Sequence, residues 1–160
     1  KGYGGFNVSL RWKDLSFNMA WSYKYGHYIW DNGFDDFCAD GYYTTHRNIT
    51  ASQLDDWTED NKDGSIPRRV MDNDQGGYYD SSRALQKGDF LRLKNLTVSY
   101  NLPKNAMNKL GVSNARVYVS GANLLTFAGT EVDPEIQSSG YYNYSMPSMR
   151  TFTLGLEVSF

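Results

Sequence analysis

The sequence predicts an all-β chain in which antiparallel strands form part of a transmembrane β-barrel. Three observations support this fold class. Apolar and polar residues alternate over five segments, the connections between the segments are alternately short and long, and aromatic residues occur near both ends of the apolar faces. Successive side chains of a strand point to opposite faces, so alternation with period two predicts strands with one apolar and one polar face.

The first two strands are expected at about residues 4–12 and 15–29. Apolar residues take the even positions of the first segment and the odd positions of the second, and the dipeptide Lys13-Asp14 separates the two. Two alternating segments joined by a very short polar turn predict an antiparallel hairpin.

A long loop is expected at about residues 30–88, where regular alternation disappears and Asp, Gly, Asn, Tyr and Ser are frequent. One short helix is predicted inside this loop. Thr50 is the expected N-cap of the helix, because Gln53 follows at the spacing of a capping box and Trp57 continues the apolar pattern. Connections of this length are typically functional.

Three further strands are expected at about residues 90–102, 116–127 and 150–160. The alternation changes parity near Lys94, which predicts either a bulge or a change of environment in the first of these strands. A proline and a glycine bound one or two predicted helical turns between the first and second of them. A second long loop is expected at about residues 128–149.

The order of short and long connections favours an outer-membrane barrel over the half-buried sheet of a soluble domain. In an up-and-down sheet all short turns then fall at one end and all long loops at the other, as in bacterial outer-membrane barrels. The segment from Phe152 to Phe160 spans roughly 26 Å at ~3.3 Å per residue. Tilted by about 40°, it covers roughly 20 Å of the membrane normal, near the ~25 Å apolar band of such barrels. Five strands do not close a barrel of this kind, so the missing strands are expected before Lys1.

The aromatic residues predict two girdles at the membrane–water boundaries. The predicted girdle residues are Trp12, Tyr100 and Phe160 near the short connections, and Tyr23, Tyr25, Phe127 and Phe152 near the long loops. The opposite face carries small polar residues, which suit a wet lumen. The charged residues expected to line this lumen are Arg11, Lys24 and Glu157, together with Arg92 and Lys94. The alternative for most of them is a solvated position on the polar face.

Composition excludes several other classes of protein. The 16 basic and 18 acidic residues give a net charge of −2, so a dedicated nucleic-acid binder is not expected. No apolar run approaches the ~18 residues of a transmembrane helix. Cys38 is the single cysteine and His27 and His46 are the two histidines, and their spacing indicates neither a catalytic triad nor a metal site. We therefore expect neither an enzyme nor a cofactor.

Acidic residues cluster in the first long loop and resemble calcium ligands only faintly. The clusters are Asp35-Asp36, Asp40, Asp55-Asp56, Glu59-Asp60, Asp63 and Asp72 to Asp74. Calcium prefers such oxygen ligands, but Val70 occupies the position where a calcium loop would need its final glutamate. We therefore expect solvated turns without a bound metal.

Several segments resemble the SusC/RagA family of TonB-linked outer-membrane transporters. The segments that carry the resemblance are GDFLRLKNLTVSY (residues 88–100) with Leu102-Pro103, RVYVSGANLLTF (residues 116–127), Asp133-Pro134-Glu135, residues 150–160, and Trp57 with Ile66-Pro67-Arg68. The resemblance covers most of residues 50–160. Residues 1–30 fit the same barrel but carry fewer distinctive positions.

The resemblance implies that the chain supplies the five C-terminal strands of a 22-stranded barrel, with two long extracellular loops. A plug domain would lie outside these residues. The resemblance also implies TonB-driven import of oligosaccharides or peptides across the bacterial outer membrane, under a SusD-like surface lipoprotein. The last strand resembles the signal that the barrel-assembly machinery reads.

Aromatic residues of the loops are the candidate contacts for a ligand or for the lipoprotein lid. Sugar rings stack on aromatic faces, and Tyr and Trp are frequent anchors at interfaces. The candidates are Tyr42, Tyr43, Trp57, Tyr78, Tyr79, Tyr141, Tyr142 and Tyr144. The alternative for each is a packing role within the loops. The alternative for the whole chain is a soluble carbohydrate-binding β-module whose site is formed by the same loops.

Overall fold

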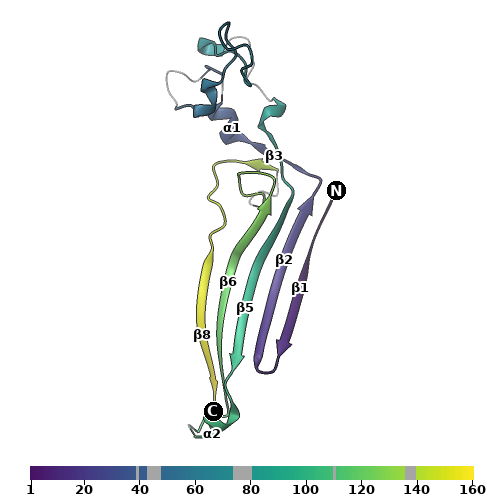
Figure 1. Cartoon of the computed structure of the whole chain (residues 1–160), viewed down its shortest axis with the longest axis vertical. Coiled ribbons are helices and arrows are strands. Elements are labelled where there is room, and N and C mark those ends of the chain that lie inside the picture. Colours follow the sequence, from purple (N-terminus) through teal and green to yellow (C-terminus); the bar gives the residue numbers. More distant parts are fainter. Residues whose placement is uncertain (39, 43–47, 74–80, 110, 136–139) are drawn as a thin grey trace. The chain divides into compact units, whose positions relative to one another are not determined.

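The chain divides into two compact units, and each is described here by itself. The sheet unit comprises residues 1–27, 88–134 and 147–160, and the loop unit comprises residues 28–87 and 135–146. The structure is a computed structural model that describes residues 1–38, 40–42, 48–73, 81–109, 111–135 and 140–160 (Figure 1).

Five antiparallel strands make up the sheet unit. They are β1 (Gly2–Trp12), β2 (Leu15–Tyr25), β5 (Phe90–Asn101), β6 (Asn114–Ala128) and β8 (Thr151–Ser159). The order in the sheet is β1-β2-β5-β6-β8, so each strand lies beside the next one along the chain (Figure 1). The prediction of an antiparallel five-stranded sheet is therefore confirmed. A short helix, α2 (Lys104–Lys109), lies in the connection between β5 and β6, as the proline and glycine there predict.

A bulge in β5 explains why its apolar residues occupy odd positions before Lys94 and even positions after it. The register of β5 shifts between Leu93 and Asn95 where it pairs with β6, and the β2–β5 register shifts at the same place. Relative to β2, Lys94 is thus the extra residue, as predicted. Relative to β6 the extra residue lies in β6, between Ala122 and Leu125. An extra residue returns the alternation to the same face, so that Leu93 pairs with Trp21 of β2 although its parity differs from that of Leu96.

The strand predicted at residues 15–29 is too long, because β2 ends at Tyr25. Gly26 follows in the left-handed region with φ +73°, which a glycine adopts without strain. Its backbone N–H donates to Oδ1 of Asp89 at 2.6 Å instead of continuing the ladder. The next residues form a separate strand, β3 (Tyr28–Asp31), which belongs to the loop unit.

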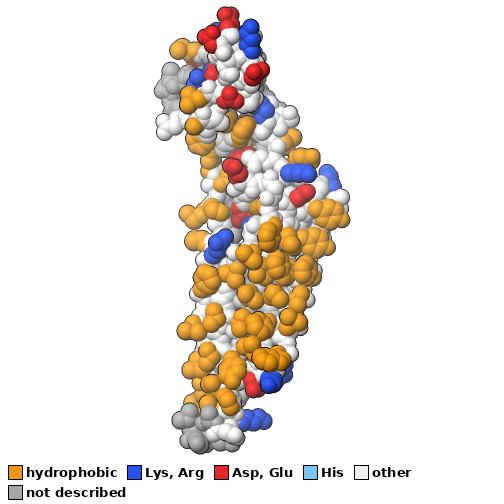
Figure 2. Space-filling view, in the orientation of Figure 1, with side chains coloured by type: hydrophobic (Ala, Val, Ile, Leu, Met, Phe, Trp, Pro, Cys, Tyr) orange, Lys and Arg blue, Asp and Glu red, His pale blue; other side chains and the backbone are white. Residues whose placement is uncertain are grey.

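Large apolar side chains cover one face of the sheet and are left exposed. The exposed fraction is 75% for Leu154, 74% for Phe152 and 69% for Trp12. Figure 2 shows hydrophobic side chains gathered over the sheet strands. Contiguous apolar patches of this kind are rare on soluble monomers, where they usually mark a contact with another protein or a membrane. This face therefore requires an apolar environment.

A close contact on the opposite face links β8 to β6. Gly155 pairs with Tyr118, and a Cβ at Gly155 would lie 2.1 Å from Cζ of the Tyr118 ring. We expect Gly155→Ala to displace the ring and to lower the free energy of unfolding of the protein by about 1 kcal/mol. Thermal unfolding of the purified protein would measure this.

The double variant Gly155→Ala/Tyr118→Ser should recover most of that loss, because the ring is then absent. Thr153→Ala, a change at an exposed position of the same strand and face, serves as the control. Equal losses in the single and double variants would contradict the contact.

The loop unit is more regular than the sequence predicts. A three-stranded sheet of order β4-β3-β7 joins β3 to β4 (Leu85–Lys87) and β7 (Tyr141–Tyr142). Helix α1 (Asn32–Phe37) follows β3, and its N-terminus is capped by Asp31, whose carboxylate accepts from the Phe34 N–H at 3.1 Å. Three short 3-10 helices follow: η1 (Ala51–Leu54), η2 (Met71–Asn73) and η3 (Ser82–Ala84). The residues of these elements show no apolar period, so the sequence pattern did not predict them.

The helix predicted after Thr50 is η1, but the predicted capping box is wrong. The Thr50 side chain makes no capping hydrogen bond. Its hydroxyl contacts Ser52 Oγ at 2.7 Å and Cys38 Sγ at 3.3 Å. These contacts use the Thr50 oxygen that a capping box would direct to the helix N-terminus. Among the described residues, no helix combines the length and the hydropathy needed to span a membrane.

Candidate functional site

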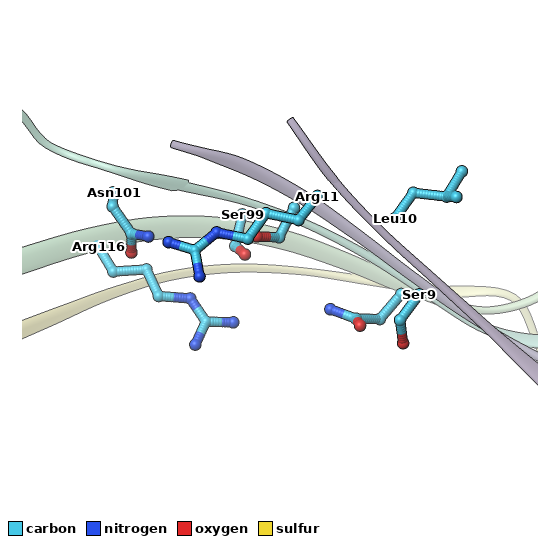
Figure 3. Close-up of a pocket in the computed structure, with 8 residues that line it drawn as sticks. Ser9, Leu10, Arg11, Ser99, Asn101 and Arg116 are labelled. Atoms are coloured by element: carbon cyan, nitrogen blue, oxygen red, sulfur yellow. The ribbon is translucent and has the colours of Figure 1, made fainter. Parts of the chain in front are cut away.

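An open cavity of about 320 Å³ lies on the polar face of the sheet. Its lining residues come from four strands: Ser9, Leu10, Arg11, Ser16, Asn18, Ser99, Asn101 and Arg116. In Figure 3 the side chains of Arg11, Asn101 and Arg116 extend to one side of the strands, and that of Leu10 extends away from them. Alternation thus places hydroxyls, amides and two guanidiniums together.

Of the five charged residues predicted to line the lumen, two lie at the same end of this face. Arg11 lines the cavity, and Glu157 pairs with Arg116 across β8 and β6. Lys24 pairs with Phe90 near the opposite end of the sheet, and Lys94 is the bulge residue of β5. Arg116 was not among the residues predicted to line the lumen, although its polar-face parity relative to Val117 was a usable signal.

A second cavity of about 320 Å³ adjoins a buried cluster around Arg92, here called the Arg92 cluster. Arg92 is 3% exposed, and its Nη2 lies 2.5 Å from Oδ1 of Asp133. Its Nε donates to the Thr126 hydroxyl at 3.0 Å and its Nη1 to the Ser148 hydroxyl at 3.2 Å. Asp133 also accepts from the Ser148 N–H at 2.9 Å. The cluster therefore joins both ends of the β6–β8 connection to β5.

The expectation that Arg92 lines a wet lumen needs correction. Its guanidinium is buried against the β6–β8 connection, where Asp133 balances its charge, and is not exposed to solvent. A buried charge needs such a partner, because removal from water costs several kcal/mol.

The predicted girdle residues lie toward the two ends of the sheet, with one departure. At the short-connection end, Leu15 of β2 pairs with Trp12 on one side and with Tyr100 on the other. At the other end Tyr23 pairs with Leu91, which pairs with Phe127, and the rings of Tyr23 and Tyr25 stack 6.4 Å apart. Phe160 follows β8 and is 94% exposed. Phe152 departs from this arrangement, because it pairs with Gly121, on the other side of the β5 bulge from Phe127.

Five of the eight candidate loop aromatics lie among the described residues. Tyr141 and Tyr144 are 52% and 54% exposed and Trp57 is 40% exposed, whereas Tyr42 and Tyr142 are half-buried. Tyr144 also packs edge-on against Phe37 at 6.0 Å. Tyr43, Tyr78 and Tyr79 lie outside the described residues. In the part of the loop unit that is described, no ring contact joins Trp57 to these tyrosines.

Two of the clustered acidic residues, Asp55 and Asp56, bind nearby groups of the loop unit. Asp55 accepts from the hydroxyl and the N–H of Ser65 at 2.6 Å and 3.1 Å. Asp56 is buried, against the prediction of a solvated turn, and forms an ion pair with Arg69 at 3.1 Å. No group of three or more potential metal ligands occurs among residues that the structure describes.

Asp40 contradicts the prediction of a solvated turn, because it is 1% exposed. Its two carboxylate oxygens accept from the guanidinium of Arg83 at 2.6 Å and 3.3 Å. The two residues are far apart in the sequence, so no local pattern reveals this pair. Asp35, Asp36 and Asp74 are among the positions whose side chains the structure does not describe.

The histidines and the cysteine form no common site in the described structure. Both ring nitrogens of His27 are buried without a hydrogen-bond partner, and burial, followed by the nearby Lys24, lowers its pKa. Cys38 is buried and contacts the Thr50 hydroxyl. His46 lies outside the described residues.

A pH dependence follows from the Asp55 and Asp56 carboxyls. The hydrogen bonds from Ser65 and then Asn61 lower the pKa of Asp55, and the hydrogen bond from Arg69 lowers that of Asp56. Both values are lower in the folded chain than the usual 3.8. Their stabilisation is therefore complete above the unfolded pKa and is lost as the pH falls through the folded pKa. We expect residues 55–69 to open in that acidic range.

Limited pepsin digestion between about pH 2 and about pH 5, with fragments mapped by mass spectrometry, would measure this opening. Wild type and Asp55→Asn/Asp56→Asn should be compared at each pH, so that the pH dependence of pepsin cancels. We expect their cleavage within residues 55–69 to differ at the upper pH and to converge at the lower one. If the ratio of cleavage in the variant to cleavage in the wild type is the same at every pH, the two carboxyls are not the cause of the opening.

No family model matches the chain. Two curated proteins of Formosa agariphila are similar to it along 98% of its length. TonB-dependent receptor P3 is 32% identical over 168 residues, and TonB-dependent receptor P26 is 31% identical over 169 residues. Each alignment covers 16% of the relative, so the chain spans about a sixth of the length of the curated relatives it matches.

Solved structures of a peptide importer are also similar. The structure of the RagAB peptide transporter aligns with 99% of this chain and 17% of its own chain, with a TM-score of 0.85 and 28% identity. The same importer in its closed-closed state gives a TM-score of 0.83 at 28% identity, and in its open-open state 0.76 at 29% identity. Fold and sequence thus point to the same set of proteins.

Proposed function

We propose that this chain, which belongs as a segment to the SusC/RagA-like TonB-dependent receptors, forms wall strands and extracellular loops of an outer-membrane importer. One observation carries the proposal. The five-stranded sheet has an exposed apolar face and a polar face rich in serine, asparagine and threonine. A barrel wall needs this combination, because one face meets lipid and the other meets water.

The position of the segment within the receptor is part of the proposal. We place it at the C-terminal end of a 22-stranded barrel, with residues 1–160 as one contiguous part of the wall and its loops. The plug and the remaining strands then lie in the five-sixths of the receptor beyond the similar region. The last strand would be the segment that the barrel-assembly machinery binds.

The proposed activity is TonB-dependent import of oligosaccharides or peptides through the bacterial outer membrane. The curated relatives are named as receptors that depend on TonB, and the solved relatives are named as a peptide importer. None of these relatives is named as an enzyme. By analogy with the two-component RagAB importer, a SusD-like lipoprotein would cover the extracellular loops.

The proposed roles of individual residues follow from their places on the two faces and in the loops. Arg11, Lys24 and Glu157 would line the lumen. Trp12, Tyr23, Tyr25, Tyr100, Phe127, Phe152 and Phe160 would lie at the membrane boundaries, where amphipathic rings are favoured. Tyr42, Trp57, Tyr141, Tyr142 and Tyr144, with Tyr43, Tyr78 and Tyr79 outside the described residues, would contact ligand or lid.

The alternative of a soluble carbohydrate-binding module is disfavoured by the exposed apolar face. A soluble sandwich would bury that face against a second sheet about 10 Å away. Within the described residues, the second sheet has only the short strands β3, β4 and β7. The longest of these has four residues, so it is too small to cover five long strands.

Fractionation of cells that express the full-length receptor tests the proposed function. We expect the receptor in the outer-membrane fraction, from which only detergent solubilises it. We also expect uptake of its oligosaccharide or peptide cargo to be lost when either TonB or the partner lipoprotein is deleted. Recovery of the native receptor from the periplasm without detergent would overturn the proposal.

A further inference from the structure

Two arginines from non-adjacent strands share the cavity on the polar face. Arg11 belongs to β1 and Arg116 to β6, and both line the same space of about 320 Å³ (Figure 3). Two strands, β2 and β5, lie between theirs in the sheet. Because paired strands hold their side chains in register, this placement is rigid and does not depend on a loop.

The positive charge of this cavity is poorly neutralised. All of its lining residues other than the two arginines are uncharged. Nη1 of Arg116 lies 3.7 Å from Oε2 of Glu157, whose side chain is 62% exposed, so the pair is weak. Nε of Arg116 is buried and has no hydrogen-bond partner. In the described structure, the hydrogen bond of the Arg11 side chain goes to a backbone carbonyl, that of Lys13 at 3.3 Å.

These groups match the chemistry of a carboxylate. Arginine binds a carboxylate through two parallel N–H···O bonds, and such charge-assisted bonds are the stronger ones. The Ser99 hydroxyl and the Asn101 amide line the same cavity and add neutral donors, and Asn101 is the strand partner of Arg116 (Figure 3). We propose that Arg11 and Arg116 form a carboxylate-binding site on the polar face of the sheet.

The carboxylate has two candidate sources, which the experiment separates. One is an acidic cargo, and the other is an acidic side chain in the five-sixths of the receptor that lies outside this segment. Both sources rest on the proposed function, in which the polar face is turned to the barrel interior.

The experiment uses the full-length receptor in detergent and three variants. Arg11→Gln/Arg116→Gln removes both charges, and Arg11→Lys/Arg116→Lys keeps the charges without the bidentate geometry. Lys104→Gln, an exposed position in the connection at the same end of the sheet, is the matched control for loss of a positive charge. The probes are triglutamate and triglutamine peptides with acetylated N-termini and amidated C-termini, so that triglutamine carries no carboxylate. Binding is measured by calorimetry, and the unfolding temperature is measured without peptide.

If the carboxylate comes from cargo, triglutamate binds and triglutamine does not, and the glutamine variant weakens triglutamate binding at least about tenfold. If it comes from the receptor itself, triglutamate does not bind, and the glutamine variant unfolds at a lower temperature than the lysine variant and the control. Either result supports the site. Absence of triglutamate binding together with equal unfolding temperatures of the glutamine and lysine variants would overturn it. Outer-membrane levels of the variants test the proposed barrel wall separately.

Discussion

Leu154→Arg is expected to reduce the amount of folded receptor in the outer membrane strongly, whereas Thr153→Arg is expected to be tolerated. Leu154 lies in the middle of β8 on the apolar face and is 75% exposed. An arginine at the bilayer midplane costs a barrel about 2–4 kcal/mol. Thr153 is the preceding residue of the same strand, and its side chain points to the polar face, where a charge remains hydrated.

Immunoblots of outer-membrane fractions, with and without heating of the samples, would measure the folded amount of each variant. The two changes introduce the same side chain at adjacent positions, so they match in charge and size. Equal reductions in both variants, or a larger reduction for Thr153→Arg, would contradict the assignment of the faces.

Asp133→Ala is expected to destabilise the receptor by about 3–5 kcal/mol, because it leaves Arg92 buried without its counter-charge. The Asp133 and Arg92 side chains are each 4% exposed, and Asp133 also accepts the Ser148 N–H. Glu131→Ala is the control, since Glu131 is an exposed acidic residue of the same connection. Thermal unfolding of the solubilised receptor would measure both changes.

A second variant separates the ion pair from other roles of Asp133. Replacement of a buried ion pair by uncharged residues is often close to neutral, so Arg92→Met/Asp133→Ala, which removes the unpaired charge without adding volume, should recover much of the stability lost in Asp133→Ala. If the double variant is less stable than Asp133→Ala, the uncompensated charge is not the cause of the loss.

The sheet could be predicted because its evidence is local. The alternation that ends with Phe152, Leu154 and Leu156 needs only neighbouring residues to be recognised, and a strand has a fixed period of two. The bulge at Lys94 was also predictable, because one extra residue changes the parity of a single strand.

The ion pairs could not be predicted, because their partners are distant in the sequence. Arg92 and Asp133 are 41 residues apart, and Asp40 and Arg83 are 43 residues apart. No sequence period connects such positions, so the sequence alone does not show that an acidic residue will be buried beside an arginine. The position of Arg116 on the polar face was available from its parity, but its share in a cavity with Arg11 depends on the order of the strands.

The end of β2 illustrates the same limit. The alternating pattern continues beyond Tyr25, but β2 ends at Tyr25. The Gly26 N–H donates to the Asp89 carboxylate instead of to a neighbouring strand. The small sheet of the loop unit was missed for a related reason. Its strands β4 and β7 have three and two residues, which is too short for a period to show.

The central claim is that the two faces of the sheet meet lipid and water, and spin labels along β8 test it most directly. Single cysteines would be introduced between Phe152 and Val158, with Gly155 left out because its position is filled by the Tyr118 ring. The background is a full-length receptor from which Cys38 and any other cysteine have been removed, reconstituted in lipid. Labels at positions 152, 154, 156 and 158 should be relaxed by oxygen, and labels at 153 and 157 by a water-soluble nickel complex. Similar relaxation by the nickel complex at every position would contradict the claim.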